Sequence, residues 1–131
     1  MIPEFEKETA PLNDEEKAML PLIIKGFESH LGEQNAIKSI DIINNFNEHK
    51  YRWRIQTELT GARLRKFVNH IRSHGLLPLI ATSKGYYVSY AHWEIEKEIQ
   101  SLEQRARGIL IAADGLKTFL KEKHSSLPYK D

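Results

Sequence analysis

The sequence predicts a mainly α fold with one small β-hairpin and a long C-terminal helix. Three stretches in the first half of the chain space their apolar residues as amphipathic helices do. Two short β-prone runs around a glycine predict the hairpin. The last third keeps a heptad spacing of apolar residues without any proline, which predicts one long helix. A length of 131 residues suits a single small domain with a modest core.

Composition places the chain among ordinary globular proteins, with 40% hydrophobic and 28% charged residues. The absence of cysteine excludes disulfides and thiolate metal sites and fits a reducing compartment. No apolar run approaches the roughly 20 residues that cross a bilayer. The acidic N-terminus, MIPEFEKETAP, lacks the apolar core of a signal peptide. We therefore expect a cytoplasmic protein without a membrane partner.

The charges are distributed unevenly along the chain. Residues 1–49 carry 4 Lys/Arg and 10 Asp/Glu, residues 50–91 carry 8 Lys/Arg and the single acid Glu58, and residues 92–131 carry 7 of each. A basic middle third predicts a polyanionic partner. The alternative is that this segment pairs internally with the acidic N-terminal third.

The first helix is expected to follow a disordered leader, residues 1–12, which is rich in acids and proline. Asn13 begins the helix, and Glu16 three residues later completes a capping box. Pro21 predicts a kink or a second start, and Gly32 predicts the residue that ends the helix. The predicted core-facing residues are Met19, Leu20, Ile23, Ile24, Phe27 and Leu31.

A second, shorter helix is predicted within NAIKSIDIINNFNEH, with Ser39 as its N-cap. Its buried side would consist of Ile42, Ile43 and Phe46. The segment KYRWRIQTEL follows, and its apolar residues alternate with polar ones. This period of two predicts a short extended segment with an aromatic side and a basic side. Trp53 and Trp93 are expected to pack against apolar side chains rather than to stack on bases.

The third helix is predicted in LTGARLRKFVNHIRSHG, residues 59–75. Thr60 is a good N-cap, and Leu59 and Leu64 can form a hydrophobic staple across it. Gly75 can adopt the left-handed conformation that ends a helix. The expected core stripe consists of Leu64, Phe67, Val68 and Ile71. The helix carries several basic side chains and no acidic one.

A hairpin follows in LLPLIATSKGYYVSY, with strands over 79–82 and 86–89 and the loop Ser83-Lys84-Gly85 between them. Residues 92–122 then form a long amphipathic helix, and residues 123–131 a flexible tail. The heptad positions, which would make a dimer interface, are Ile95, Ile99, Leu102, Ala106, Ile109, Ala113, Leu116 and Leu120. The same stripe would also serve a helix that folds back on the first helix to complete its core.

Three helices followed by a two-stranded wing form the winged helix-turn-helix arrangement, here over residues 13–91. The stretch ELTGARLRKFVNHIR followed by LPLIATSKGYYVS resembles the recognition helix and wing of winged helix-turn-helix DNA-binding proteins carried by phages and integrated mobile elements. The resemblance covers roughly residues 15–90 and implies DNA binding in a regulatory or replication role. The link before the basic helix departs from it, with about ten residues where a helix-turn-helix has 3–4.

The helical period predicts which side chains of the basic helix face DNA. Arginine pairs with guanine, asparagine pairs with adenine, and alanine allows close approach in the major groove. The expected base contacts are therefore Ala62, Arg65, Lys66 and Asn69. The expected backbone contacts are Arg52, Arg54, Thr60, Arg63, His70, Arg72 and Ser73, together with Thr82, Ser83, Lys84 and Tyr86 on the hairpin.

The predicted function is sequence-selective binding of double-stranded DNA, as a phage-type regulator or replication accessory that forms a homodimer through the C-terminal helix. There is no Walker loop, dinucleotide fingerprint or nucleophile elbow, and His70 and His74 lack a third metal ligand. We therefore expect no enzymatic activity, cofactor, metal or small-molecule ligand.

Two alternatives stay open. The chain could be a protein–protein adaptor that uses the winged helix as a scaffold and the C-terminal helix as its interface. Acidic side chains that cover Arg63, Arg65 and Lys66 would favour the adaptor. RNA binding through Arg52, Trp53 and Arg54 is a weaker option, which a preference for single strands would support.

Overall fold

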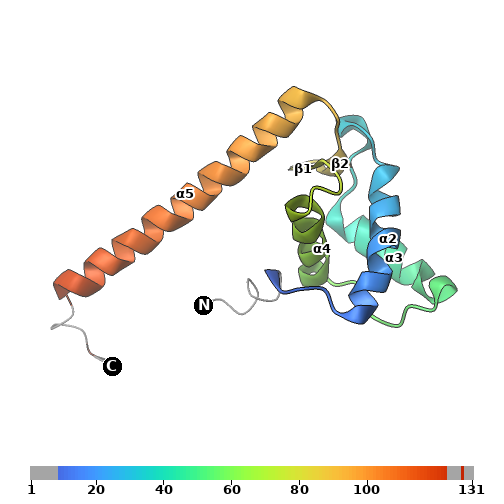
Figure 1. Cartoon of the computed structure of the whole chain (residues 1–131), viewed down its shortest axis with the longest axis horizontal. Coiled ribbons are helices and arrows are strands. Elements are labelled where there is room, and N and C mark those ends of the chain that lie inside the picture. The colour runs from blue at the N-terminus through green and yellow to red at the C-terminus, as the bar shows by residue number, and fades with distance from the viewer. Residues whose placement is uncertain (1–8, 124–127, 129–131) are drawn as a thin grey trace. The chain divides into compact units, whose positions relative to one another are not determined.

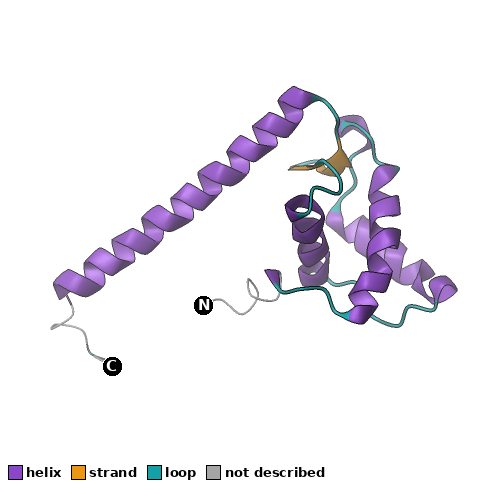
Figure 2. Ribbon diagram, in the orientation of Figure 1, coloured by secondary structure: helices purple, strands orange, loops and turns teal. Residues whose placement is uncertain are grey.

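The computed structural model describes residues 9–123 and residue 128, and it divides into two compact units, one up to Ile95 and one from Glu96. Figure 1 shows the elements along the chain, and Figure 2 shows that helices dominate and that the hairpin is short. The elements are α2 (Asp14–Glu28), α3 (Ser39–His49), α4 (Gly61–Ser73), β1 (Leu79–Thr82), β2 (Gly85–Val88) and α5 (His92–Lys123), with the 3₁₀ helices η1 (Glu33–Asn35) and η2 (Lys50–Trp53). The prediction of a mainly helical fold with a hairpin and a long C-terminal helix is confirmed.

Helix α2 begins with the predicted capping box. The Asn13 side chain accepts a hydrogen bond from the Glu16 N–H (2.8 Å), and the Glu16 carboxylate accepts one from the Asn13 N–H (2.9 Å). The helix continues through Pro21 to Glu28. The prediction that Gly32 ends this helix was wrong, because the C-cap residue is Ser29, three residues earlier. Gly32 instead adopts a φ of 85° at the turn into η1.

The leader is only partly described. Residues 1–8 lie outside the described residues, as do 124–127 and 129–131 of the predicted tail. The prediction of disorder over residues 1–12 was wrong at its C-terminal end, because Leu12 is 6% exposed and belongs to the hydrophobic core. An apolar side chain directly before the helix cap therefore fastens the leader to the N-terminal unit.

The core of the N-terminal unit lies between α2, α3, α4 and the hairpin, which Figure 1 shows gathered around one another. The α4 stripe is buried as predicted, and Phe46 is buried on α3. Phe27 packs edge-on against Tyr86 of β2, with ring centroids 5.8 Å apart. On α3 the prediction of Ser39 as N-cap was wrong by one residue, since Lys38 holds that position without a side-chain cap.

The segment after α3 is not extended, so the prediction from its alternating pattern was wrong. Residues 50–53 form η2, and Arg54 closes it in the left-handed conformation (φ 59°). The Trp53 ring packs on Phe46 of α3, with centroids 5.8 Å apart, and Ile55 is buried. The tight turn therefore buries Ile55 and packs one side of the Trp53 ring, whereas Tyr51, the third residue of the alternating pattern, stays 69% exposed.

The hairpin pairs antiparallel, and Thr82 lies opposite Gly85. The connecting loop is therefore Ser83-Lys84, one residue shorter than predicted, and Gly85 belongs to β2. The other edge of β2 is also hydrogen-bonded. Ile37 and Tyr86 exchange two backbone hydrogen bonds (2.9 and 2.8 Å). The Val88 carbonyl accepts from the Gly32 N–H (2.9 Å), and the Val88 N–H donates to the His30 carbonyl (2.8 Å), on either side of Leu31. The segment between α2 and α3 thus fixes the hairpin from outside.

Helix α5 has 32 residues and a length of about 48 Å at 1.5 Å per residue. None of its residues is buried. Ile95 is half-buried, and the other large apolar side chains are exposed by 37% at Leu102 to 72% at Leu116. No helix among the described residues is both long enough and apolar enough to cross a membrane.

We expect Gly85→Ala to destabilise the N-terminal unit by about 2–4 kcal/mol. Gly85 has a φ of 122°, and a Cβ there would lie 2.3 Å from the Ile37 carbonyl oxygen, so the pairing between these segments would have to open. Urea unfolding followed by circular dichroism measures the loss in the free energy of unfolding.

Gly26→Ala is the matched control, because a Cβ at that position on α2 meets nothing within 4 Å. It should add about 0.5–1 kcal/mol through helix propensity. Equal effects of the two variants would contradict the close approach.

Candidate nucleic-acid interface

Helix α4 is positioned at both ends by local signals in its own sequence. The Thr60 hydroxyl accepts a hydrogen bond from the Arg63 N–H (3.2 Å), which confirms the predicted N-cap. Leu59 and Leu64 are both 1% exposed, as the staple requires. At the other end Gly75 adopts φ 62° directly after the C-cap residue His74, as predicted.

Two contacts from distant elements fix the approach to α4, and sequence patterns did not indicate either. The Asn47 amide of α3 accepts a hydrogen bond from the Leu59 N–H (2.8 Å) and donates one to the Leu59 carbonyl (3.0 Å). The Glu15 carboxylate accepts from the N–H groups of Gln56 (3.1 Å) and Thr57 (2.8 Å). A hydrogen bond from the Thr57 side chain, ahead of the N–H bonds from Thr57 and Gln56, holds the pKa of Glu15 below its ordinary value. The connector between α3 and α4, residues 50–60, is therefore tied to α2 and α3.

The exposed line of α4 consists of Arg65, Asn69 and Ser73, which lie four residues apart on one side of the helix. Ala62 is half-buried beside this line. The Arg65 guanidinium lies back over the first turn of the helix, where a Cβ on Gly61 would be 3.5 Å from its Nη1. Among the four predicted base contacts, Arg65 and Asn69 are thus the two with exposed side chains.

Lys66 and Arg63 are instead held by a buried carboxylate. The Glu16 side chain is 2% exposed, and it accepts from Lys66 Nζ (2.7 Å) and Arg63 Nε (2.9 Å). The side chains of Lys66 and Arg63 are 14% and 30% exposed. The prediction that Lys66 reaches a base conflicts with this arrangement, because its ammonium lies against α2. Arg63 likewise spans Glu16 and the Glu58 carbonyl (2.9 Å) rather than extending outward.

The charged form of Glu16 is favoured overall. Burial acts to raise its pKa, but the hydrogen bonds from Lys66, the Asn13 N–H and Arg63 outweigh burial and hold the pKa below the ordinary value. Arg63 also acts electrostatically on the neighbouring Glu15 carboxylate. The acidic third of the chain therefore pairs with the basic third at this position.

The described end of the leader covers one side of α4. Residues 9–12 and α4 enclose a groove of about 450 Å³, which Lys66, Asn69, His70, Ser73 and His74 line from the helix side. The rings of His70 and His74 stack with centroids 4.0 Å apart. Burial first, and the charge of His74 second, lower the pKa of His70. A neutral, half-buried His70 is a poor partner for a phosphate, which weighs against its predicted role.

The hairpin presents a polar tip, in which Thr82, Ser83 and Lys84 are exposed. Lys84 Nζ lies 3.3 Å from the Glu33 carboxylate, and Lys38 Nζ donates to the Ser83 carbonyl (2.6 Å). Lys38 adds a positive charge at the tip that sequence patterns did not indicate. Tyr86 does not belong to this tip. Its ring is half-buried against Phe27, so its predicted contact with the DNA backbone conflicts with the packing.

Arg72 joins α4 to the hairpin, because its Nε donates to the Leu79 carbonyl (3.2 Å). This bond ties the C-terminal half of α4 to the first residue of β1. Arg52 and Arg54 are exposed but lie on or next to η2, which packs on α3. The predicted backbone contacts thus come from two separate parts of the N-terminal unit.

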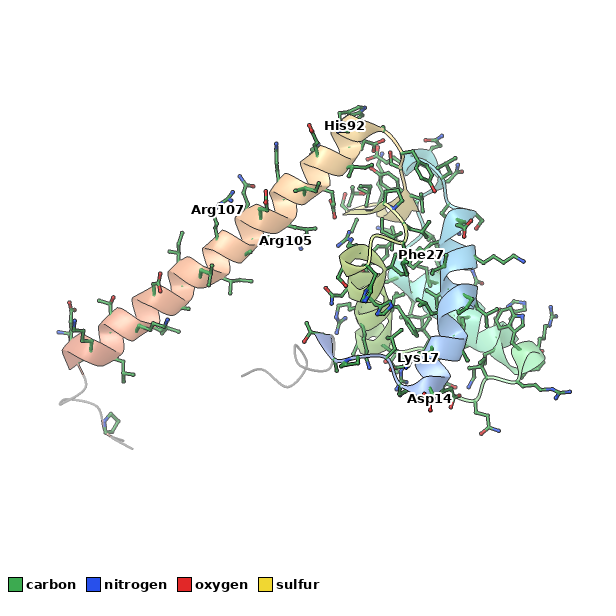
Figure 3. All side chains as sticks on the ribbon, viewed as in Figure 1. Asp14, Lys17, Phe27, His92, Arg105 and Arg107 are labelled. Carbon is green, nitrogen blue, oxygen red and sulfur yellow. The ribbon has the colours of Figure 1, made fainter. Side chains whose placement is uncertain are left out.

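Figure 3 shows the side chains along α2, with Lys17 near one end and Phe27 toward the hairpin.

We expect Glu16→Gln to lower the free energy of unfolding by about 2–3 kcal/mol at pH 7, because it leaves Lys66 and Arg63 without their carboxylate. Glu16 has a lowered pKa in the folded state. Its stabilising effect is therefore complete above the unfolded-state pKa of about 4.5 and is lost as the pH falls through the folded-state pKa. The difference between wild type and variant in urea unfolding should shrink below about pH 4.5.

Glu28→Gln provides the control, since Glu28 is exposed in the last turn of the same helix. Its effect should stay within about 0.5 kcal/mol at every pH. A Glu16→Gln variant that behaves like this control would show that the ion pairs do not hold α2 to α4.

Comparisons of the chain with protein-family models, with curated protein sequences and with solved structures found no match.

Proposed function

We propose that the N-terminal unit is a winged helix that binds double-stranded DNA through α4 and the hairpin, and that α5 joins two copies of the chain. The single observation that carries this proposal is that the basic helix α4 and the hairpin that follows it both present exposed polar groups and contain no acidic residue. These groups are the line Arg65, Asn69 and Ser73 on the helix and Thr82, Ser83 and Lys84 at the hairpin tip, and residues 59–89 include no Asp or Glu. An α-helix fits the major groove of B-DNA, and basic side chains beside it attract the phosphates.

Base readout is assigned to Arg65 and Asn69. An arginine forms two hydrogen bonds with guanine, and an asparagine forms two with adenine. Half-buried Ala62 beside them allows the helix to approach the bases closely. Lys66 and Arg63 act indirectly in this scheme, because they hold the angle of α4 through Glu16.

Backbone contacts are assigned to polar and basic groups around the helix, all of them exposed except the half-buried Arg72. They comprise Thr60, Arg72 and Ser73 near α4, Thr82, Ser83 and Lys84 at the hairpin tip, and Arg52 and Arg54 as a second ridge beyond α3. The resemblance to winged helices of phages and mobile elements favours a regulatory or replication role without catalysis.

An adaptor function is the second candidate, and one observation favours it. The Glu16 carboxylate covers Arg63 and Lys66. These are two of the three cations of α4 whose cover by acidic side chains would favour an adaptor. Arg65 lies on the exposed line instead. In the adaptor the winged helix would be a scaffold, and the apolar side chains of α5 would bind another protein.

Fluorescence anisotropy with labelled duplexes across a salt series tests DNA binding. Affinity should fall steeply with salt, because each phosphate contact releases a counterion. After selection of a preferred duplex, Arg65→Ala and Asn69→Ala should each reduce the preference for it over random duplex on the order of tenfold. The result expected for Arg72→Ala is weaker binding to all sequences.

Lys25→Ala is the control, since it removes an exposed charge from α2 and should leave both affinities unchanged. Circular dichroism of each variant separates lost binding from lost folding. A folded wild-type protein that does not bind duplex at low salt, or that binds without a salt slope, would exclude the DNA-binding proposal and leave the adaptor.

A further inference from the structure

The apolar seam of α5 has an uneven pattern of large and small side chains. One set of heptad positions holds only large residues: Ile95, Leu102, Ile109 and Leu116. The alternate set holds two large and two small residues: Ile99, Ala106, Ala113 and Leu120. In a two-stranded coil the residues that face each other across the seam depend on the direction of the helices. The pattern therefore carries information about that direction.

We propose that two copies of α5 pair in antiparallel orientation, centred between Ala106 and Ile109. This inference rests on the self-association in the proposed function and adds its direction and register. The partner is a second copy of this chain because one helix supplies both halves of a complementary seam. The layers are Ile95 on Leu120, Ile99 on Leu116, Leu102 on Ala113 and Ala106 on Ile109, each formed twice. Every alanine then faces a large side chain, so the seam is filled evenly.

A parallel pair of the same helices would be poorly packed. Each position would then face its own copy, so Ala106 and Ala113 would each form an alanine–alanine layer. Two such layers would leave unfilled space near the middle of the helix, and unfilled space in a core is destabilising. Parallel packing would also bring Glu98 beside Glu103 of the other copy, and these like charges would repel.

Charge favours the antiparallel register as well. In this register Glu96 of one copy lies beside Lys117 of the other, and the twofold symmetry repeats the pair. Within its own helix Lys117 makes a loose pair with Asp114 at 4.0 Å, and both side chains are more than three-quarters exposed. Lys117 therefore has room to turn toward a partner helix.

The register also sets a distance. Ile95, the last residue of the N-terminal unit, would lie opposite Leu120 of the other copy. The two Ile95 residues would then be about 37 Å apart along the coil, at roughly 1.5 Å per residue. Successive major grooves on one side of B-DNA are about 34 Å apart. The proposed pairing thus holds the two attachment points at a separation close to this repeat.

Disulfide trapping in the full chain tests the orientation, because the sequence contains no native cysteine. Leu102→Cys and Ala113→Cys are made separately, mixed under reducing conditions to exchange subunits, and then oxidised. The antiparallel pair should yield a cross-linked dimer only from the mixture, since Leu102 faces Ala113 of the other copy. A parallel pair would cross-link each variant with itself, and it would hold the two positions 11 residues, or about 16 Å, apart, which is too far for a disulfide.

Light scattering of the wild type and both variants before oxidation separates the possible failures. A monomer would overturn both the pairing and the proposed self-association, and would leave DNA binding to its own test. A dimer in which each variant cross-links with itself would overturn only the direction. A trimer or tetramer would overturn the two-stranded seam.

A charge reversal provides a second test that leaves the seam intact. Lys117→Glu should raise the dissociation constant of the dimer roughly three- to tenfold, because it sets a glutamate against Glu96. Adding Glu96→Lys should restore the affinity. Lys121→Glu, on the outer side of the helix, is the matched control and should change little. In a parallel dimer Lys117 would face Ala112, so an unchanged affinity of Lys117→Glu would contradict the antiparallel register.

Discussion

The arrangement of the N-terminal unit depends on the ion pairs that the buried Glu16 carboxylate makes with two cations of α4. This carboxylate completes the cap of α2 at Asn13 and, 47 and 50 residues further along the chain, it binds Arg63 and Lys66. A carboxylate that is 2% exposed must have its charge compensated, because a bare buried charge is very costly. The two cations meet that requirement. In doing so they set how α4 lies against α2, and hence which of its side chains remain outside.

This arrangement explains which parts of the structure the sequence could predict. Thr60, Gly75 and the α4 core stripe were predicted correctly, because each depends on residues within one helix. The capping role of Glu16 was also predicted, but its second role was not. The same carboxylate oxygens that serve a local cap also serve a contact across the fold, and no local pattern distinguishes the two cases. The base contact predicted for Lys66 therefore conflicts with the ion pair that its ammonium makes with Glu16.

The connector after α3 shows the same limit. Alternating residues are typical of a strand, and Tyr51, Trp53 and Ile55 follow that pattern. A ring on α3, Phe46, and a left-handed residue, Arg54, provide another way to bury part of the segment, and the chain takes it. Tertiary packing overrides the local period here. The hairpin, whose strands pair with each other, was predicted to within one residue for the opposite reason.

The hydrogen bonds on both edges of β2 have a consequence for how this unit can be divided. The bonds from Ile37 to Tyr86 and from Gly32 to Val88 connect segments about fifty residues apart, so β2 has this neighbour only when both segments are present. The α4–hairpin segment therefore depends on the rest of the N-terminal unit for its structure. Moved alone into another scaffold, it would lose both the outer neighbour of β2 and the carboxylate that orients α4. Residues 12–89 would therefore have to be transferred together to keep this arrangement.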